Sequence, residues 1–248
     1  LHEAQSHWQQ LVELYDSEPK RLEQSPLSYL NALEQYADTA IRNNEPTAAQ
    51  WAIDRFQELA REKRFRSRRM ARELTQRQAW LQLALPLRNH DWARAEATTS
   101  ELPGQAEARE FEPTFRFKYS LMQALTAFAR EDTSAADRWL SFLQEDPALA
   151  KHSLCATQTE CLNVLSAGWQ DDPQRFQQCL DRLGEARLSN PQLEQLREVV
   201  QDARKQLLNG EAEPVSHALR GALQTKSLPL GPYFDLDAWL NGRSSSNG

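Results

Sequence analysis

The sequence predicts an all-α protein built from consecutive helical hairpins. Its 248 residues include only five Val and two Ile, while Leu, Ala, Gln, Glu and Arg dominate. Branching at Cβ favours a pleated strand, whereas Ala and straight-chain residues lose little freedom in a helix. Apolar residues recur at helical spacing, and short polar segments interrupt them at regular intervals. We therefore expect helices throughout and no sheet.

Five polar breakers divide the apolar pattern. Asn, Asp, Gly and Pro dominate them, and these residues cap and stop helices. The starts of successive breakers are 45, 42, 40 and 39 residues apart. A period of about 20–50 residues with two helices per unit is typical of stacked hairpins, in which each unit buries its apolar face against its neighbours. The breakers are residues 43–46, 88–91, 130–133, 170–173 and 209–212.

We expect three regions along the chain. Residues 1–26 form an N-terminal helix or cap, because an apolar stripe that includes Trp8 and Tyr15 precedes a polar stretch. Residues 27–225 form the hairpin domain. Residues 226–248 form a C-terminal extension that ends in a flexible tail.

The C-terminal extension departs from the helical pattern because two prolines interrupt it. It carries three aromatic residues, Tyr233, Phe234 and Trp239. A terminal hairpin needs a cover for its apolar face. These aromatic residues therefore either fold back as a cap on the last hairpin or dock another molecule, and we favour the cap.

Small residues flank the breakers where two antiparallel helices come closest. Ala37 and Ala49 bracket the first breaker, Ala124 and Ala136 bracket the third, and Ala95 follows the second. This pattern resembles the tetratricopeptide repeat, in which a small residue of the first helix meets an Ala of the second. The segment His-Asp-Trp-Ala-Arg-Ala at residues 90–95 is similar to that family's turn into its second helix.

The resemblance implies a right-handed solenoid of about five helical hairpins, with first helices lining a groove that holds a peptide or helix of a partner protein. The spacing of about 40 residues exceeds the family's repeat of about 34, so the helices or loops must be longer here. A plain helical bundle with similar hairpins is the alternative architecture.

The charge is unevenly distributed. Residues 1–60 carry −6, residues 61–100 carry +6, and residues 101–248 carry −6. Seven of the twelve residues from 61 to 72 are Arg or Lys. If that segment is one helix, a row of Arg on one of its sides has no acidic neighbour at i+3 or i+4, whereas a second row is compensated by Glu73.

This basic run has three interpretations: a surface that solvent or the chain's own acidic flanks neutralise, a site for an acidic protein, or a site for nucleic acid or anionic lipid. An isoelectric point near 5.5 and a single aromatic residue in the run, Phe65, argue against nucleic acid. We predict a partner protein, with an acidic peptide or helix favoured and a homo-oligomer as an alternative. The predicted contact residues are Arg66, Arg68, Arg69, Arg72, Arg77, Arg116 and Lys118.

Two other functions remain open from the sequence. One is a sensor or oligomerisation region of a larger signalling or transcription regulator, which the Leu at position 1 permits. The other is a helical-repeat nucleic-acid binder that uses residues 61–77.

No pattern of catalytic residues stands out. His152, Cys155 and Cys161 lack a fourth metal ligand at useful spacing, and no nucleophile has a local signature or a phosphate-binding glycine loop. We therefore predict no enzymatic activity, no cofactor and no metal. No apolar run reaches the roughly 18–20 residues of a membrane span. An odd number of cysteines favours a cytoplasmic protein, with a periplasmic protein or a membrane-tethered fragment as alternatives.

Overall fold

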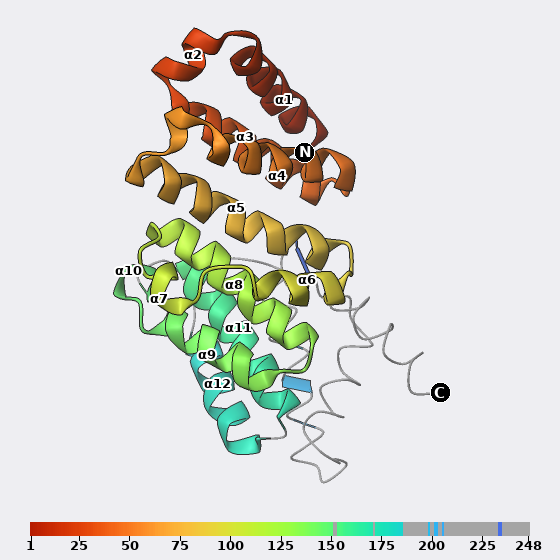
Figure 1. Cartoon of the computed structure of the whole chain (residues 1–248). Coiled ribbons are helices and arrows are strands. Elements are labelled where there is room, and N and C mark those ends of the chain that lie inside the picture. The colour runs from red at the N-terminus through yellow and green to blue at the C-terminus, as the bar shows by residue number, and fades with distance from the viewer. Residues whose placement is uncertain are drawn as a thin grey trace. The chain divides into compact units, whose positions relative to one another are not determined.

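The computed structural model is all-α in the residues that it describes, as the composition predicted (Figure 1). These are residues 1–150, 153–170, 172–185, 198, 201–202, 205 and 233–234. The helices are α1 (His2–Ser17), α2 (Pro19–Gln24), α3 (Pro26–Arg42), α4 (Pro46–Arg61), a 3-10 turn η1 (Lys63–Phe65), α5 (Arg68–Arg88), α6 (Trp92–Thr99), α7 (Gln105–Ala108), α8 (Pro113–Ala129), α9 (Thr133–Gln144), α10 (Pro147–Ala150), α11 (Ser153–Trp169) and α12 (Pro173–Glu185).

The chain divides into two compact units, Leu1–Met122 and Gln123–Gly248. In the first unit α3 packs against α1, α4 and α5, and α5 also packs against α4 and α6. Tyr29, Phe56 and Trp80 are fully buried there. In the second unit α11 packs against α9 and α12. Consecutive helices thus share apolar faces within each unit.

Four of the polar breakers form turns with the same backbone hydrogen bond. In each turn an N–H just before the next helix donates to a carbonyl five residues earlier, which satisfies an orphan carbonyl at the end of the preceding helix. Three of the turns contain a residue with positive φ: Asn44 at 61°, His90 at 58° and Glu131 at 61°. The hydrogen bonds are Glu45 N to Ala40 O (2.9 Å), Asp91 N to Pro86 O (2.9 Å), Asp132 N to Ala127 O (3.0 Å) and Asp172 N to Ala167 O (3.3 Å).

Aspartates cap the helices that follow three of these turns. The carboxylate of Asp91 accepts a hydrogen bond from the backbone N–H of Arg94 at 3.0 Å. Asp132 and Asp172 accept the equivalent bonds from the N–H groups three residues on, at 2.9 Å each. An N-cap of this kind is worth about 1 kcal/mol, so the helix starts follow from local sequence.

The small residues expected at the hairpin contacts are buried. Ala37 on α3 and Ala49 on α4 have no exposed surface, and these two helices pack against each other. Ala95, Ala124 and Ala136 are buried as well. A larger side chain at any of these positions would have to displace the neighbouring helix, because interiors are close-packed.

The basic run is not a single helix. α4 ends at Arg61, η1 follows, and α5 begins at Arg68 with Ser67 as its N-cap, whose hydroxyl accepts from Met70 N at 3.3 Å. The conditional prediction of one Arg row along residues 61–72 is therefore wrong for the part that crosses residues 62–67. Of the predicted row, only Arg68 and Arg72 lie on one helix and share a face.

The second helix of the next hairpin, α6, is only 8 residues long. Hydroxyls near its end bond back to the carbonyls of the preceding turn, from Thr98 to Arg94 O at 2.8 Å and from Ser100 to Ala97 O at 2.8 Å. Such bonds compete with helix propagation, and Pro103 then prevents its continuation. The chain instead forms a strap, residues 100–112, that contains α7 and leads to α8.

Candidate partner-binding groove

Hydrogen bonds to α8 and α5 hold the strap near its two ends. The Tyr119 hydroxyl donates to the carbonyl of Pro103 at 2.6 Å, and the Glu112 N–H donates to Gln76 Oε1 at 3.1 Å. The ring of Phe111 lies edge-on to Tyr119, with centroids 5.5 Å apart, and Phe111 is buried. The strap therefore has a fixed path beside α5.

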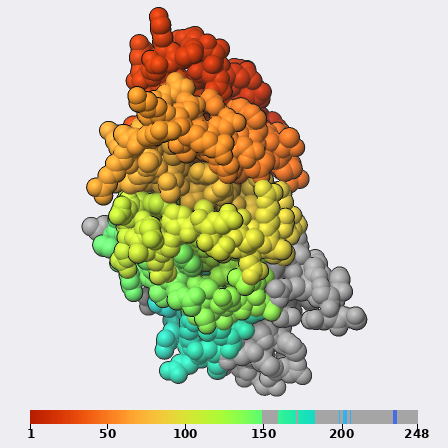
Figure 2. Space-filling view, viewed as in Figure 1, coloured from red at the N-terminus to blue at the C-terminus, as the bar shows by residue number. Residues whose placement is uncertain are grey.

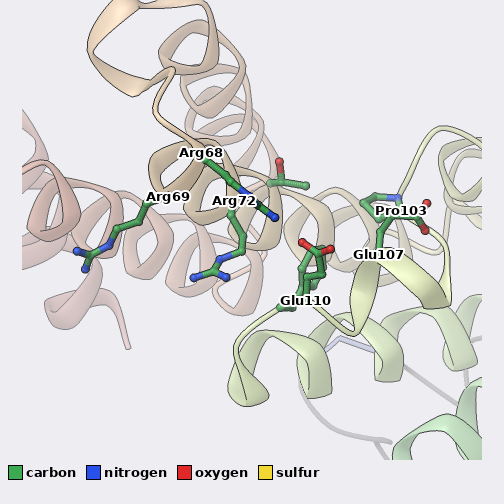
Figure 3. A pocket seen from close by; sticks show the side chains of 8 residues that line it. Arg68, Arg69, Arg72, Pro103, Glu107 and Glu110 are labelled. Atoms are coloured by element: carbon green, nitrogen blue, oxygen red, sulfur yellow. The ribbon is translucent and has the colours of Figure 1, made fainter.

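A cavity of about 590 Å³ lies between the N-terminal half of α5 and the strap (Figure 3). A second cavity of about 500 Å³ adjoins it, since Thr75, Pro103 and Glu107 line both. Together they form what we call the α5 groove. Along α5 its lining runs from residue 68 to residue 82, which is about 21 Å at the rise of an α-helix.

The two walls of the α5 groove carry opposite charge. Its α5 wall has three arginines, Arg68, Arg69 and Arg72, and its strap wall has three glutamates, Glu101, Glu107 and Glu110. All six residues are exposed, and within the described part of the chain none of them takes part in a salt bridge. Charges on these walls are therefore available to a ligand.

The three arginines do not point the same way. Figure 3 shows Arg68 and Arg72 on the side of α5 that is nearer to Glu107 and Glu110, whereas Arg69 extends away from the strap. Positions 68 and 72 are one helical turn apart, so their side chains share a face. In the space-filling view both this part of α5 and the strap reach the surface (Figure 2).

Two of the predicted contact residues are not on this surface. Arg77 is 5% exposed, and its guanidinium pairs with Glu73 through Nη1. The same guanidinium donates to Asn31 Oδ1 at 2.6 Å, and its Nε lies 3.4 Å from Glu34 Oε2. Arg77 is thus buried inside the unit and held by Glu73, Asn31 and Glu34.

Lys118 completes the same network from α8. Its ammonium donates to Glu34 Oε1 at 2.8 Å and lies 4.3 Å from the centroid of the Trp80 ring. The network therefore holds two cations against two buried carboxylates, those of Glu34 and Glu73. It joins α3, α5 and α8, and we assign Arg77 and Lys118 to internal packing in place of the predicted partner contact.

The remaining predicted arginines lie beside the groove. Arg66 is exposed before the start of α5 and donates to the carbonyl of Arg61 at 3.0 Å. Arg116 is half-buried on α8 and donates to the carbonyl of Arg109 at 3.2 Å. Neither lines the α5 groove.

The structure describes two of the three aromatic residues predicted to matter in the C-terminal extension. Phe234 is fully buried in the second unit, with its ring centroid 6.2 Å from that of Phe128. Tyr233 is half-buried, and Trp239 lies outside the described residues. Phe234 is therefore part of the core of the second unit.

Among the residues that the structure describes, the cysteines belong to no metal site. His152 lies outside the described residues, and the side chain of Cys155 does as well. Cys161 and Cys179 are buried and free, and burial raises the pKa of the Cys161 thiol to about 12. A protonated thiol is a poor ligand and a poor nucleophile. Among the described residues no three His, Cys, Asp or Glu side chains gather as a metal would require.

No helix in the described ranges is long and apolar enough to cross a membrane. Comparison of the chain with protein-family models, with curated proteins and with solved structures found no match.

The spacing of about 40 residues predicts longer helices or longer loops without distinguishing the two, and after α6 the extra length is the strap. The position of the strap and its acidic wall is not predicted, because by sequence these glutamates belong only to an acidic flank. The signal that could have revealed it is the Pro103-Gly104 pair followed closely by Glu107 and Glu110, because such a pair stops a helix.

Proposed function

We propose that this protein is a non-catalytic recognition module that binds a segment of a partner protein in the α5 groove. The observation that carries the proposal is the contrast between the cations of one helix. Arg77 is buried and paired with Glu73 and Glu34, whereas Arg68 and Arg72 are exposed without a salt bridge among the described residues. A guanidinium of this kind can receive a carboxylate through two parallel hydrogen bonds.

A tetratricopeptide-like α-solenoid remains our proposed architecture. It is supported by the shared geometry of the four turns, in which an N–H donates to a carbonyl five residues earlier. It is also supported by the packing in the first unit, where α3 contacts both members of the pair α4 and α5. Solenoids of this class present extended surfaces to partner proteins.

Selection from a displayed library of random 12-residue peptides tests the proposal. We expect the wild type to enrich peptides that the double variant R68E/R72E no longer retains. Arg68 is the first residue of α5, where a glutamate is favourable to the helix, and Arg72 is an exposed position one turn later, so far-UV circular dichroism should be unchanged.

The matched control is K20E/R42E. It changes the net charge by the same amount at two exposed positions outside the α5 groove. The control should retain the enriched peptides. Equal retention by R68E/R72E would contradict the proposal. In a separate titration with single-stranded oligonucleotides, binding whose affinity falls steeply on added salt would instead favour nucleic-acid binding.

A further inference from the structure

The opposite charges of the two walls limit what the α5 groove can hold. A purely acidic ligand gains from Arg68 and Arg72 but meets the like charge of Glu107 and Glu110 across the cavity, and like charges at close range are unfavourable. A purely basic ligand would gain from the two glutamates but would meet the like charge of the two arginines. A suitable ligand carries both signs on opposite sides, with carboxylates toward α5 and cations toward the strap (Figure 3).

An extended chain has this two-sided character. Its successive side chains point in opposite directions and rise about 3.3 Å each, so residues i and i+2 are about 6.6 Å apart on one side. Arg68 and Arg72 are separated by four residues of α-helix, about 6 Å along the axis. Acidic residues at alternate positions of an extended segment therefore match the spacing of these two guanidinium groups, with basic residues between them facing the strap.

The positive charge of the α5 groove is confined to one end of its α5 wall, whereas Glu101 continues the acidic strap wall toward the other end. Beyond Arg72 the α5 wall continues with Thr75, Gln78 and Gln82, which bear no charge. Their hydroxyl and amide groups both donate and accept hydrogen bonds, as a peptide backbone requires. A groove of about 21 Å accommodates about six extended residues, of which only the first three or four face the arginines of the α5 wall.

We propose that the occupant of the α5 groove is an extended segment of a partner protein in which acidic and basic residues alternate over about four positions and uncharged polar residues follow. This inference rests on the proposed function and specifies the chemistry of its ligand. It excludes a uniformly acidic peptide as the preferred partner.

Fluorescence anisotropy with three labelled peptides tests the inference. The first has the sequence Glu-Lys-Glu-Lys-Gln-Gln, the second is the block isomer Glu-Glu-Lys-Lys-Gln-Gln, and the third is Glu-Glu-Glu-Glu-Gln-Gln, each flanked by the same neutral residues. The first two have identical composition and zero net charge, so only the order differs. We expect the alternating peptide to bind about tenfold more tightly than either of the others, from two exposed ion pairs gained on each wall.

Two groove variants supply a stricter test with the alternating peptide. R68E/R72E should lose about tenfold in affinity. The charge-swapped variant R68E/R72E/E107R/E110R should recover it, because a shift of one residue exchanges the two sides of an extended chain. K20E/R42E should keep the affinity, since both exposed positions lie outside the α5 groove. Far-UV circular dichroism confirms that each variant is folded.

Equal binding of the alternating and block peptides, tighter binding of the all-acidic peptide, or no recovery in a folded charge-swapped variant would overturn the inference. None of these results would contradict the proposed function, which the library selection decides. Failure of all three peptides to bind would also overturn the inference. In that case peptides enriched by the wild type and lost by R68E/R72E would still support recognition in the α5 groove.

Discussion

The substitution Arg77→Met should destabilise the first unit strongly. It removes the cation that pairs with Glu73 and approaches Glu34, while keeping a long side chain on α5. In this variant the Glu73 carboxylate keeps one neutral hydrogen-bond donor, because Gln76 Nε2 donates to it at 2.9 Å. Glu34 still has Lys118 at 2.8 Å. One buried carboxylate therefore loses its counter-ion.

The size of the effect follows from burial. Glu73 and Arg77 are 4% and 5% exposed, so solvent cannot replace the lost partner. Removing one partner of such a pair costs about 3–5 kcal/mol. The guanidinium also lies 4.6 Å from the centroid of the Phe115 ring, a contact worth about 0.5–1 kcal/mol. With a urea m-value of about 2 kcal/mol/M, the loss corresponds to a midpoint lower by about 2 M.

Urea unfolding followed by far-UV circular dichroism measures this shift. Arg72→Met is the matched control, since it removes a cation from the same helix at an exposed position and should change stability by less than about 0.5 kcal/mol. The double variant Glu73→Leu/Arg77→Met should recover much of the loss, because replacing both partners of a buried pair is often nearly neutral. A midpoint shift for Arg77→Met no larger than that of the control would refute the assignment of Arg77 to internal packing.

Two further perturbations test contacts elsewhere. Tyr29→Phe should cost about 1–2 kcal/mol in urea unfolding, because the buried hydroxyl donates to Asp16 at 2.8 Å and accepts from Arg55 at 3.0 Å; an unchanged midpoint would exclude that role. Burial alone raises the pKa of Asp137, but hydrogen bonds from Arg175, Gln170 and Ser166 outweigh it and hold the pKa below its ordinary value of 3.8. A depressed folded-state pKa gives stability that is present above about pH 4 and is lost as the pH falls through the folded value. Asp137→Asn should therefore be less stable at pH 7 and should lose less stability than the wild type between pH 5 and pH 2, as measured by urea midpoints across that range; parallel pH profiles would contradict this.

The sequence by itself determined the local structure. Few β-branched residues and a helical apolar period predicted helices, and four polar breakers predicted the ends of α3, α5, α8 and α11. Asp91 and Asp132 cap the helices after their turns because a carboxylate reaches an N–H only two or three residues away. Such contacts depend on neighbours in the chain, so they can be inferred from residue order alone. The basic character of residues 61–72 was also evident.

Tertiary structure decided which cations face solvent. The i,i+4 spacing predicts that Glu73 compensates Arg77 and not Arg72, and the structure contains this pair. Only the packing of α3 and α8 decides that Arg77 is buried while Arg72 stays exposed. The partners of Lys118 could not be inferred, because Glu34 lies 84 residues away.

The acidic wall of the α5 groove likewise depends on the path of the strap past α5, which the contacts of Pro103 and Glu112 fix. The physical reason is that the position of a helix end depends on hydrogen bonds between residues within one turn of each other. The burial and pairing of a charge respond to packing between helices that residue order does not bring together.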